Sequence, residues 1–215
     1  GGSREYVNRA VTQLKSRGVH IVNQAVQSIS RNDGKVQLVV NEISHQFDQV
    51  VLATHTDQAL KLLSDPTINE LRLLQSIAYQ KNTAILHTDE KLLPKNKQCW
   101  AAWNYSTTRS NNDQFVSVSY LINKLQPLPK IWDKKPIIVS LNPLREPDPS
   151  HVHRVIEYHH PIFDSSATTA QKNLPLIQGM NHTWFCGAWS GYGFHEDGLR
   201  SGQLVAQSIQ EQTRH

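Results

Sequence analysis

Cysteine is scarce in this 215-residue chain, which contains only Cys99 and Cys186, far apart in the sequence. A secreted disulfide framework needs more cysteines in a short chain, so this class of protein is not supported. Each cysteine has an aromatic neighbour, which is typical of a buried thiol that acts as a small apolar side chain. A disulfide between the two stays open as an alternative. The scarcity of cysteine predicts a reducing, cytoplasmic location.

Long apolar runs and a signal sequence are also absent. No stretch approaches the roughly 18 to 20 consecutive apolar residues that a transmembrane helix requires. No basic segment followed by an apolar one resembles a signal peptide, although a targeting signal upstream of Gly1 stays open. The hydrophobic fraction of 38% and the charged fraction of 19% are typical of a soluble globular protein rather than a disordered one.

Positive charge is not concentrated anywhere, although the net charge is +4. Nucleic-acid-binding proteins gather Lys and Arg on one helix face or stripe, whereas the lysines here are separated by prolines and acidic residues. We therefore expect no nucleic-acid partner. His151 and His153 would lie on the same side of one predicted strand, but no Cys or carboxylate completes a ligand set, so we expect no metal site.

Apolar periodicity predicts a mixed α/β (α+β) fold. An amphipathic helix over residues 3–17 is followed by short strands, with a hairpin turn at residues 32–34. Residues 49–54 form a continuous apolar run, typical of a strand buried on both faces of a sheet. Further helices are expected over residues 57–63, 68–77, 165–174 and 196–212. Further strands are expected over residues 19–22, 25–30, 35–40, 44–47, 83–87, 99–105, 115–121, 137–141, 152–158 and 183–188.

One of these strands shows a clear period of two. In residues 115–121 the larger side chains of Val116, Val118 and Tyr120 alternate with serines. This alternation predicts a sheet with one face in contact with water.

The end of the chain carries the most informative pattern. A buried strand candidate leads into a glycine-rich turn at residues 190–195, and the helix after this turn opens with Glu196-Asp197-Gly198. The first backbone N–H groups of a helix have no partner within it, and the helix dipole adds partial positive charge there. Such an end binds an anion, or a carbonyl that gains negative charge. The glycines of the turn and helix would let a flat ligand approach the backbone closely.

The segment FCGAWSGYGFHEDGLRSGQLVAQSI, residues 185–209, resembles the closing motif of the flavin-containing amine oxidase superfamily. That superfamily includes protoporphyrinogen oxidases and phytoene desaturases, and the resemblance is greatest to bacterial proteins described as NAD/FAD-binding or amine-oxidase-like. The resemblance implies that this motif runs along the flavin of FAD and that its helix points at the pyrimidine edge of the ring system. Reduced flavin carries negative charge there, and a helix N-terminus stabilises it.

Three further segments match the family in order: residues 1–21, residues 23–29 (NQAVQSI) and residues 47–54 (FDQVVLAT). They resemble the family's glycine pair with its helix, the strand whose backbone reaches the adenine near Val26, and the strand that returns beside the cofactor. Their order along the chain supports the resemblance more than any one of them does alone.

The resemblance implies a partial Rossmann-like FAD-binding domain at residues 1–60 and 181–215. A substrate domain, with a mixed β-sheet flanked by helices, is implied at residues 61–180. The cofactor-binding residues that it implies are Val26, Ala53, Thr54, Gly187, Ala188, Trp189, Gly191, Tyr192, Gly193, Phe194, His195, Glu196, Asp197 and Gly198.

For several of these residues a plainer interpretation stays open. The aromatic residues of the turn and His195 could line the flavin or a substrate channel, or could simply pack the turn against a sheet. Glu196 and Asp197 also suit the general preference for negative charge at a helix start. We expect contacts with flavin to come from backbone N–H groups more than from these carboxylates.

Two departures from the family pattern limit the prediction. The dinucleotide fingerprint G-x-G-x-x-G is absent, and no strand precedes the opening glycines. Because that motif lies near the N-terminus in the superfamily, we expect this chain to be the C-terminal half of a longer protein. In addition, Ala188 follows Gly187 where many relatives have an acidic residue. The contact that this acid makes must therefore come from elsewhere or from backbone.

Outside the motif, two groups of residues are candidates for the border of an active site. Trp100, Trp103 and Tyr105 alternate in a predicted strand, so one face could meet a substrate or could pack within the sheet. His159-His160-Pro161 is the other candidate. Ser190 lacks the flanking glycines of a hydrolase nucleophile elbow, so that reaction class is not supported.

The resemblance implies that the complete protein is an FAD-dependent oxidoreductase that moves a hydride equivalent from a small-molecule substrate to flavin N5. An amine, or an apolar unsaturated molecule such as a lipid or isoprenoid, is the implied substrate class. No side chain is identified as a catalytic acid or base. The alternative is a non-catalytic fragment or substrate-binding module that cannot hold FAD by itself. Surface left bare by a missing half is expected to favour self-association.

Overall fold

The computed structural model describes residues 2–110, 113–132 and 135–213 and divides into two compact units. Unit 1 comprises Gly1–Ile21 and Lys81–His160, and unit 2 comprises Val22–Gln80 and Pro161–His215. Gly1, the first residue of the predicted glycine pair, lies outside the described residues. Across the described ranges, no helix combines the length and the apolar character needed to cross a membrane.

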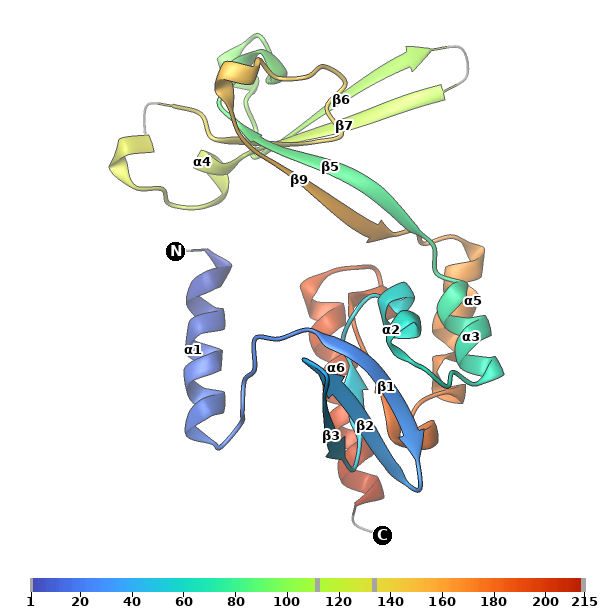
Figure 1. The fold of residues 1–215 in the computed structure, drawn as a ribbon. Helices are drawn as coiled ribbons and strands as arrows, with labels where there is room; N and C mark the ends of the chain where they lie inside the picture. The colour runs from blue at the N-terminus through green and yellow to red at the C-terminus, as the bar shows by residue number, and fades with distance from the viewer. Residues whose placement is uncertain (1, 111–112, 133–134, 214–215) are drawn as a thin grey trace. The chain divides into compact units, whose positions relative to one another are not determined.

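Unit 2 begins with an antiparallel meander of three strands in the order β1-β2-β3 (Figure 1). The strands are β1 (Val26–Asn32), β2 (Lys35–Val40) and β3 (Ile43–Phe47). Asp33 and Gly34 connect β1 to β2 with φ values of 52° and 71°. Two consecutive residues with positive φ match the turn that suits the twist of a hairpin, so the predicted hairpin is confirmed.

A parallel pair of short strands forms the second sheet of unit 2. β4 (Val50–Leu52) pairs with β10 (Thr183–Phe185), so that Leu52 lies opposite Phe185. Both residues belong to the main buried cluster, together with Ile29 and Leu74. The helices of this unit are α2 (Thr56–Leu62), α3 (Ile68–Gln75), α5 (Ser165–Asn173) and α6 (His195–Gln212).

The two outer edges of the parallel pair differ. At β10 the side-chain amide of Gln178 bonds both polar groups of the Phe185 backbone: it accepts from the N–H at 2.8 Å and donates to the carbonyl at 2.7 Å. This amide takes the place of a neighbouring strand. Among the described residues β4 pairs with β10 alone, so its other edge has no strand beside it.

Unit 1 contains a five-stranded sheet in the order β6-β7-β8-β5-β9. Its strands are β5 (Tyr79–His87), β6 (Trp103–Ser110), β7 (Asp113–Leu121), β8 (Ile138–Leu141) and β9 (Val152–Pro161). The β6–β7, β7–β8 and β8–β5 pairs are antiparallel. The α-helices of this unit are α1 (Ser3–Ser16) and the short α4 (Ile122–Leu125). The mixed α/β class predicted from the sequence is therefore confirmed.

Three predictions about local structure are wrong. Residues 19–22 form no strand, and Val22 is 67% exposed, because no neighbouring strand pairs with this β-branched run among the described residues. The strand predicted from residue 99 begins only at Trp103, since residues 97–99 form a single 3-10 turn. Cys99 is consequently exposed rather than buried, whereas Cys186 is buried as predicted, and both thiols are free.

The alternation in β7 is present, but its polar side is the buried one. Ser117 and Ser119 are almost fully buried, whereas Val116 is 40% exposed. Amphipathic alternation alone does not tell which face of a sheet is covered.

The best-anchored point of unit 2 is a buried ion pair. Arg31 of β1 donates from Nη1 to Glu70 Oε1 at 2.7 Å and from Nη2 to Glu70 Oε2 at 3.0 Å. Its Nε donates to Asp65 Oδ1 at 2.9 Å, and its Nη1 lies 3.3 Å from Thr183 Oγ1 at the start of β10. Burial by itself lowers the pKa of Arg31, but hydrogen bonds and charges from Glu70 and Asp65 outweigh it and raise the pKa.

Replacing Glu70 by Gln tests how much this ion pair contributes to the stability of the fold. We expect the free energy of unfolding to fall by about 3 kcal/mol, because the buried guanidinium loses its counter-ion. Urea denaturation followed by circular dichroism measures the change. The matched control is Glu157→Gln, which removes the exposed partner of Lys81 and should cost less than about 1 kcal/mol. Equal losses in the two variants would contradict the role given to the buried pair.

Candidate functional site

In the structure the glycine-rich turn extends over residues 187–194, between β10 and α6, and Gly187 determines its course. Gly187 has a φ of 152°, and a Cβ built on it would lie 2.6 Å from Nε1 of Trp189. Only glycine fits such a conformation and such a close approach. Residues Ala188–Ser190 then form one 3-10 turn, and the Ser190 hydroxyl donates back to the Gly187 carbonyl at 2.8 Å.

Helix α6 is joined to this turn by a serine. The backbone N–H of Gly187 donates to Ser201 Oγ at 2.9 Å, and the Ser201 hydroxyl donates to the Gly198 carbonyl at 2.8 Å. A Cβ on Gly198 would lie 3.6 Å from the backbone nitrogen of Ala188, which shows how closely the first turn of the helix packs on the strand end. The sequence prediction missed Ser201, although its position three residues after a glycine of the motif was a usable signal.

Trp189 connects the turn to the end of β4. Its indole Nε1 donates to the Thr54 carbonyl at 3.1 Å, and the residue is only 4% exposed, within the main buried cluster. The structure therefore brings Thr54 next to Gly187 and Trp189, from which it is far apart in the sequence. Ala53 is exposed directly after β4, whereas Val26 is in the other sheet, at the start of β1.

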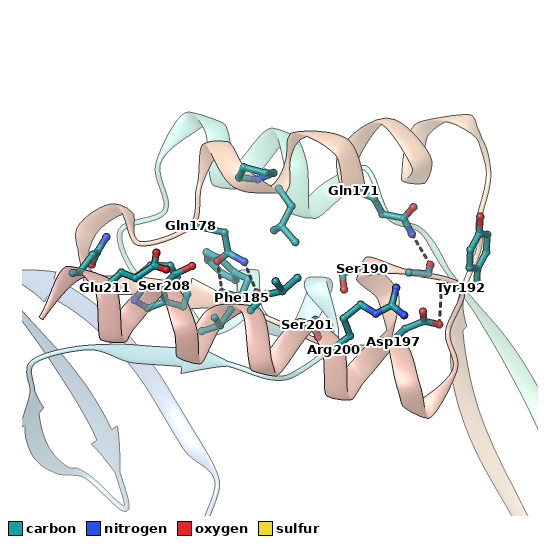
Figure 2. Close-up of a pocket in the computed structure, with 17 residues that line it drawn as sticks. Gln171, Gln178, Phe185, Ser190, Tyr192, Asp197, Arg200, Ser201, Ser208 and Glu211 are labelled. Carbon is teal, nitrogen blue, oxygen red and sulfur yellow. Dashed lines mark hydrogen bonds between the residues drawn. The ribbon is translucent and has the colours of Figure 1, made fainter. Parts of the chain in front are cut away.

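Asp197 organises the glycine-rich turn from within the helix. Its Oδ2 accepts from the backbone N–H groups of Tyr192 at 3.1 Å and Phe194 at 3.0 Å, as Figure 2 shows for Tyr192. A Cβ on Gly191 would lie 2.6 Å from this carboxylate, so that position also requires glycine. The Asp197 carboxylate therefore stabilises the turn itself.

The N-terminus of α6 keeps two free donors. Among the described residues, the N–H groups of His195 and Glu196 have no hydrogen-bond partner, whereas those of Asp197 and Gly198 bond the Phe194 carbonyl. The aromatic side chains beside them point away from the core, with Tyr192 80% and Phe194 68% exposed. The N–H groups at this end of the helix can therefore donate to a carbonyl or an anion. The exposed aromatic rings provide a flat apolar surface beside it.

A large groove begins at the same turn and runs along α6 (Figure 2). Its volume is about 910 Å³. The Gln171 amide at its wall donates to the carbonyls of Trp189 and Gly191, both at 2.8 Å, and so holds the turn against α5. The residues that line the groove are Gln171, Leu174, Pro175, Gln178, Trp184, Phe185, Ser190, Gly191, Tyr192, Asp197, Arg200, Ser201, Leu204, Val205, Ser208, Glu211 and Gln212. Neither Gln171 nor Gln178 carried a signal in the sequence.

Other titratable groups offer little chemistry near the turn. Burial raises the pKa of the Cys186 thiol, which therefore stays protonated and unreactive at neutral pH. In the part of the chain that the structure describes, no three His, Cys, Asp or Glu residues gather as metal ligands. His151 and His153 belong to no such group among those residues.

In unit 1, one face of the sheet exposes aromatic side chains. Trp103 is 67% and Tyr105 64% exposed, and Trp103 makes an edge contact with Tyr120 at 5.8 Å between ring centroids. Trp100 does not share this face, because its indole N–H donates to the Pro94 carbonyl and its ring packs beside Leu93. His160 belongs to the other group expected at the border of an active site. Its Nδ1 forms a hydrogen bond with Asn82 at 2.9 Å.

The fold is similar to those of several solved enzyme structures. A putative protoporphyrinogen oxidase from Exiguobacterium sp. 255-15 matches with a TM-score of 0.59 and 13% identity, over 95% of this chain and 51% of that chain. Cyclohexylamine oxidase from Brevibacterium oxydans IH-35A matches with a TM-score of 0.57 and 11% identity, over 94% and 51%. A conjugated-linoleic-acid-producing fatty acid isomerase from P. acnes matches with a TM-score of 0.56 and 17% identity, over 86% and 47%.

These matches confirm, at the level of the fold, the resemblance to amine oxidases and protoporphyrinogen oxidases. The chain spans about half the length of the structures that it matches. No protein-family model matches the sequence, and no curated protein sequence does so either.

The close packing at Gly187 gives a direct test of the turn. We expect Gly187→Ala to displace the Trp189 indole and to lower the free energy of unfolding by about 1–3 kcal/mol, because a methyl group has no room there. Tryptophan fluorescence and urea denaturation report the two effects. The control is Gly202→Ala, where nothing lies within 4 Å of the new methyl group and helix propensity predicts a gain of up to about 1 kcal/mol. If the Gly187 variant is as stable as the Gly202 variant, the turn does not depend on this packing.

Proposed function

We propose that this chain supplies the C-terminal part of an FAD-dependent oxidoreductase, in which the glycine-rich turn and the start of α6 contact the flavin. The observation that carries the proposal is the pair of unpartnered N–H groups on His195 and Glu196, held at the end of a parallel strand pair. The cofactor-binding residues are those implied by the family resemblance. In this proposal residues 1–60 and 181–215 belong to the FAD-binding domain and residues 61–180 to the substrate domain.

Among the described residues, the outer edge of β4 has no neighbouring strand. This unpaired edge supports the proposal that a further segment completes the FAD-binding domain. A parallel sheet of two short strands is rarely stable alone, because parallel strands are normally buried within larger sheets. The Gln178 amide occupies both backbone polar groups of Phe185 at the outer edge of β10, which favours extension of the sheet beyond β4. We infer that the missing segment adds a parallel strand at β4 and brings the phosphate-binding loop to the carboxyl ends of the strands, beside Ala53 and Thr54.

The protein's part in the reaction would be placement and electrostatics. When bound, FAD supplies the hydride acceptor, and the protein orients it and excludes water. The N–H groups of His195 and Glu196, with the dipole of α6, would stabilise negative charge on the reduced ring. The exposed Trp103 and Tyr105 of unit 1 suit an amine or an apolar unsaturated substrate, because aromatic faces attract cations and apolar groups.

The alternative is a non-catalytic module that cannot hold FAD by itself. One feature favours it for the isolated chain: Ala188 offers no carboxylate at the position where many members of the superfamily have one. The same bare edge at β4 would then favour self-association.

The cofactor proposal predicts a difference between two proteins. We expect the 215-residue chain to be colourless when purified. If a phosphate-binding loop is joined to this chain, a protein that contains both should carry one flavin per chain, because the loop holds the pyrophosphate of FAD. Visible absorbance measures the flavin in both. A stoichiometric flavin spectrum from the 215 residues alone would show that the missing half is not needed.

The role of the α6 N-terminus is tested in the flavin-bound protein by His195→Pro. Proline is tolerated at the first helical position and removes one of the two free N–H groups. The flavin reduction potential should become more negative by about 30–60 mV, which corresponds to the loss of one hydrogen bond to a charged group. Redox titration measures this shift.

Two control variants separate the N–H group from other effects. His195→Ala removes the same side chain but keeps the N–H, so its potential should stay near that of the unmodified protein. Ile68→Pro makes the same change at the first position of α3, a helix that contributes no residue to the turn or the groove. A similar shift in either control would contradict the proposed contact.

A further inference from the structure

The five-stranded sheet of unit 1 buries a row of polar side chains on one face. Sheets normally cover apolar side chains, so a buried polar row needs hydrogen-bond partners throughout. Each residue of the row is at most 6% exposed. The row crosses four neighbouring strands and consists of Asn104 on β6, Ser117 and Ser119 on β7, Ser140 on β8 and His87 on β5.

The protonation of His87 is determined by its neighbours. The backbone N–H of Asp89 donates to His87 Nδ1 at 3.1 Å, so Nδ1 carries a lone pair and not a proton. Burial lowers the pKa of His87, which keeps the ring neutral. A neutral ring with a bare Nδ1 carries its proton on Nε2, which therefore donates to Ser140 Oγ at 2.8 Å.

This proton arrangement directs the next hydrogen bond. Ser140 is fully buried, and its hydroxyl oxygen lies 2.6 Å from that of Ser119. Because Ser140 already accepts from His87, its own proton has only the Ser119 oxygen as an acceptor among the described residues. Ser140 therefore donates to Ser119. The Ser119 proton is left without an acceptor, since no hydrogen bond from Ser119 to any other described group is present.

A small cavity lies at the end of this chain of hydrogen bonds. Its volume is about 210 Å³, and the buried polar residues that line it are Ser119, Ser117 and Asn104, which form its floor. The hydrogen bonds of Asn104 are made to Ala101 and Ser119, and Ser117 donates to the Leu141 carbonyl. The Ser119 hydroxyl is therefore the unused donor at the floor. The volume is below the roughly 300 Å³ at which sites for drug-sized ligands begin.

Two cationic side chains line the same cavity, Lys91 and Arg145. Neither forms an ion pair among the described residues. Lys91 has two acidic neighbours, Asp89 and Asp148. Burial works to raise the pKa of Asp89, but backbone hydrogen bonds from Asp148 and Lys91 and the charge of Lys91 lower it. Hydrogen bonds from Ser150 and the charges of His151 and Lys91 lower the pKa of Asp148. These two carboxylates thus offset the Lys91 charge, whereas the Arg145 charge is available to a ligand.

We propose that this cavity binds a small oxyanion, a phosphate or carboxylate group, through the Ser119 hydroxyl and the Arg145 guanidinium. The oxyanion accepts the one proton that the series His87–Ser140–Ser119 leaves unused, and its charge balances the cations at the rim. The site lies wholly within unit 1 and is separate from the glycine-rich turn of unit 2. It does not depend on FAD, so it stands or fails independently of the function proposed above.

Titration of the full chain with inorganic phosphate, and separately with acetate, tests the site. Saturable shifts are expected in the ¹⁵N signals of His87, because a ligand that accepts from Ser119 polarises the whole series of hydrogen bonds. The two titrations distinguish the two oxyanion classes. Without ligand, the same spectrum should show a proton on Nε2 and none on Nδ1. A proton on Nδ1 would overturn the direction of the hydrogen bonds and with it the proposal.

Arg145→Gln should weaken binding of the preferred anion at least about tenfold, because a hydrogen bond to a charged group is lost. The matched control is Arg154→Gln on β9, an exposed arginine that does not line the cavity and whose loss should leave the affinity within about twofold.

Ser119→Ala removes the donor at the floor and should weaken binding by a similar factor, provided that circular dichroism shows an intact fold. Arg145 is exposed, so its variant keeps the test valid if Ser119→Ala unfolds. The proposal is overturned if neither anion gives saturable shifts, or if Arg145→Gln and Arg154→Gln weaken binding equally.

Discussion

The buried contact between Arg31 and Glu70 is the constraint on which the arrangement of unit 2 depends. It joins β1 to the start of α3, and through Thr183 it reaches the first residue of β10. Burying two charges is costly unless each is fully bonded, and here both guanidinium ends and both carboxylate oxygens have partners. A displaced β1 would leave a bare charge in the core. The position of β10 is therefore determined within narrow limits.

The glycine-rich turn and α6 take their positions from β10. The turn starts at Gly187, two residues after Phe185 of β10. The Trp189 indole then donates to the carbonyl of Thr54, which follows β4. Ser201 then ties the first turns of α6 to the Gly187 backbone. The start of α6, which carries the free N–H groups, is thus fixed by contacts to the strand ends. A contact with a cofactor requires such a rigid position.

Much of this arrangement could be predicted from local pattern, and the rest could not for identifiable reasons. The α6 helix and the hairpin at Asp33 are confirmed because periodicity and turn residues are local properties. The Arg31–Glu70 pair and the Gln178 amide on β10 depend on tertiary contacts, and no single-sequence pattern marks such partners. The strand expected at residues 19–22 is wrong because β-branched residues favour a strand only where a neighbour can pair with them. The flavin contacts themselves stay a prediction.

A binding site whose contacts come from backbone N–H groups requires few specific side chains. At the turn the requirements are glycine at 187 and 191, where a Cβ would meet other atoms within 3 Å, and a carboxylate at 197 that bonds the turn. The unpartnered N–H groups of α6 come from any helix-forming residues at 195 and 196. Such a site tolerates change at most surrounding positions.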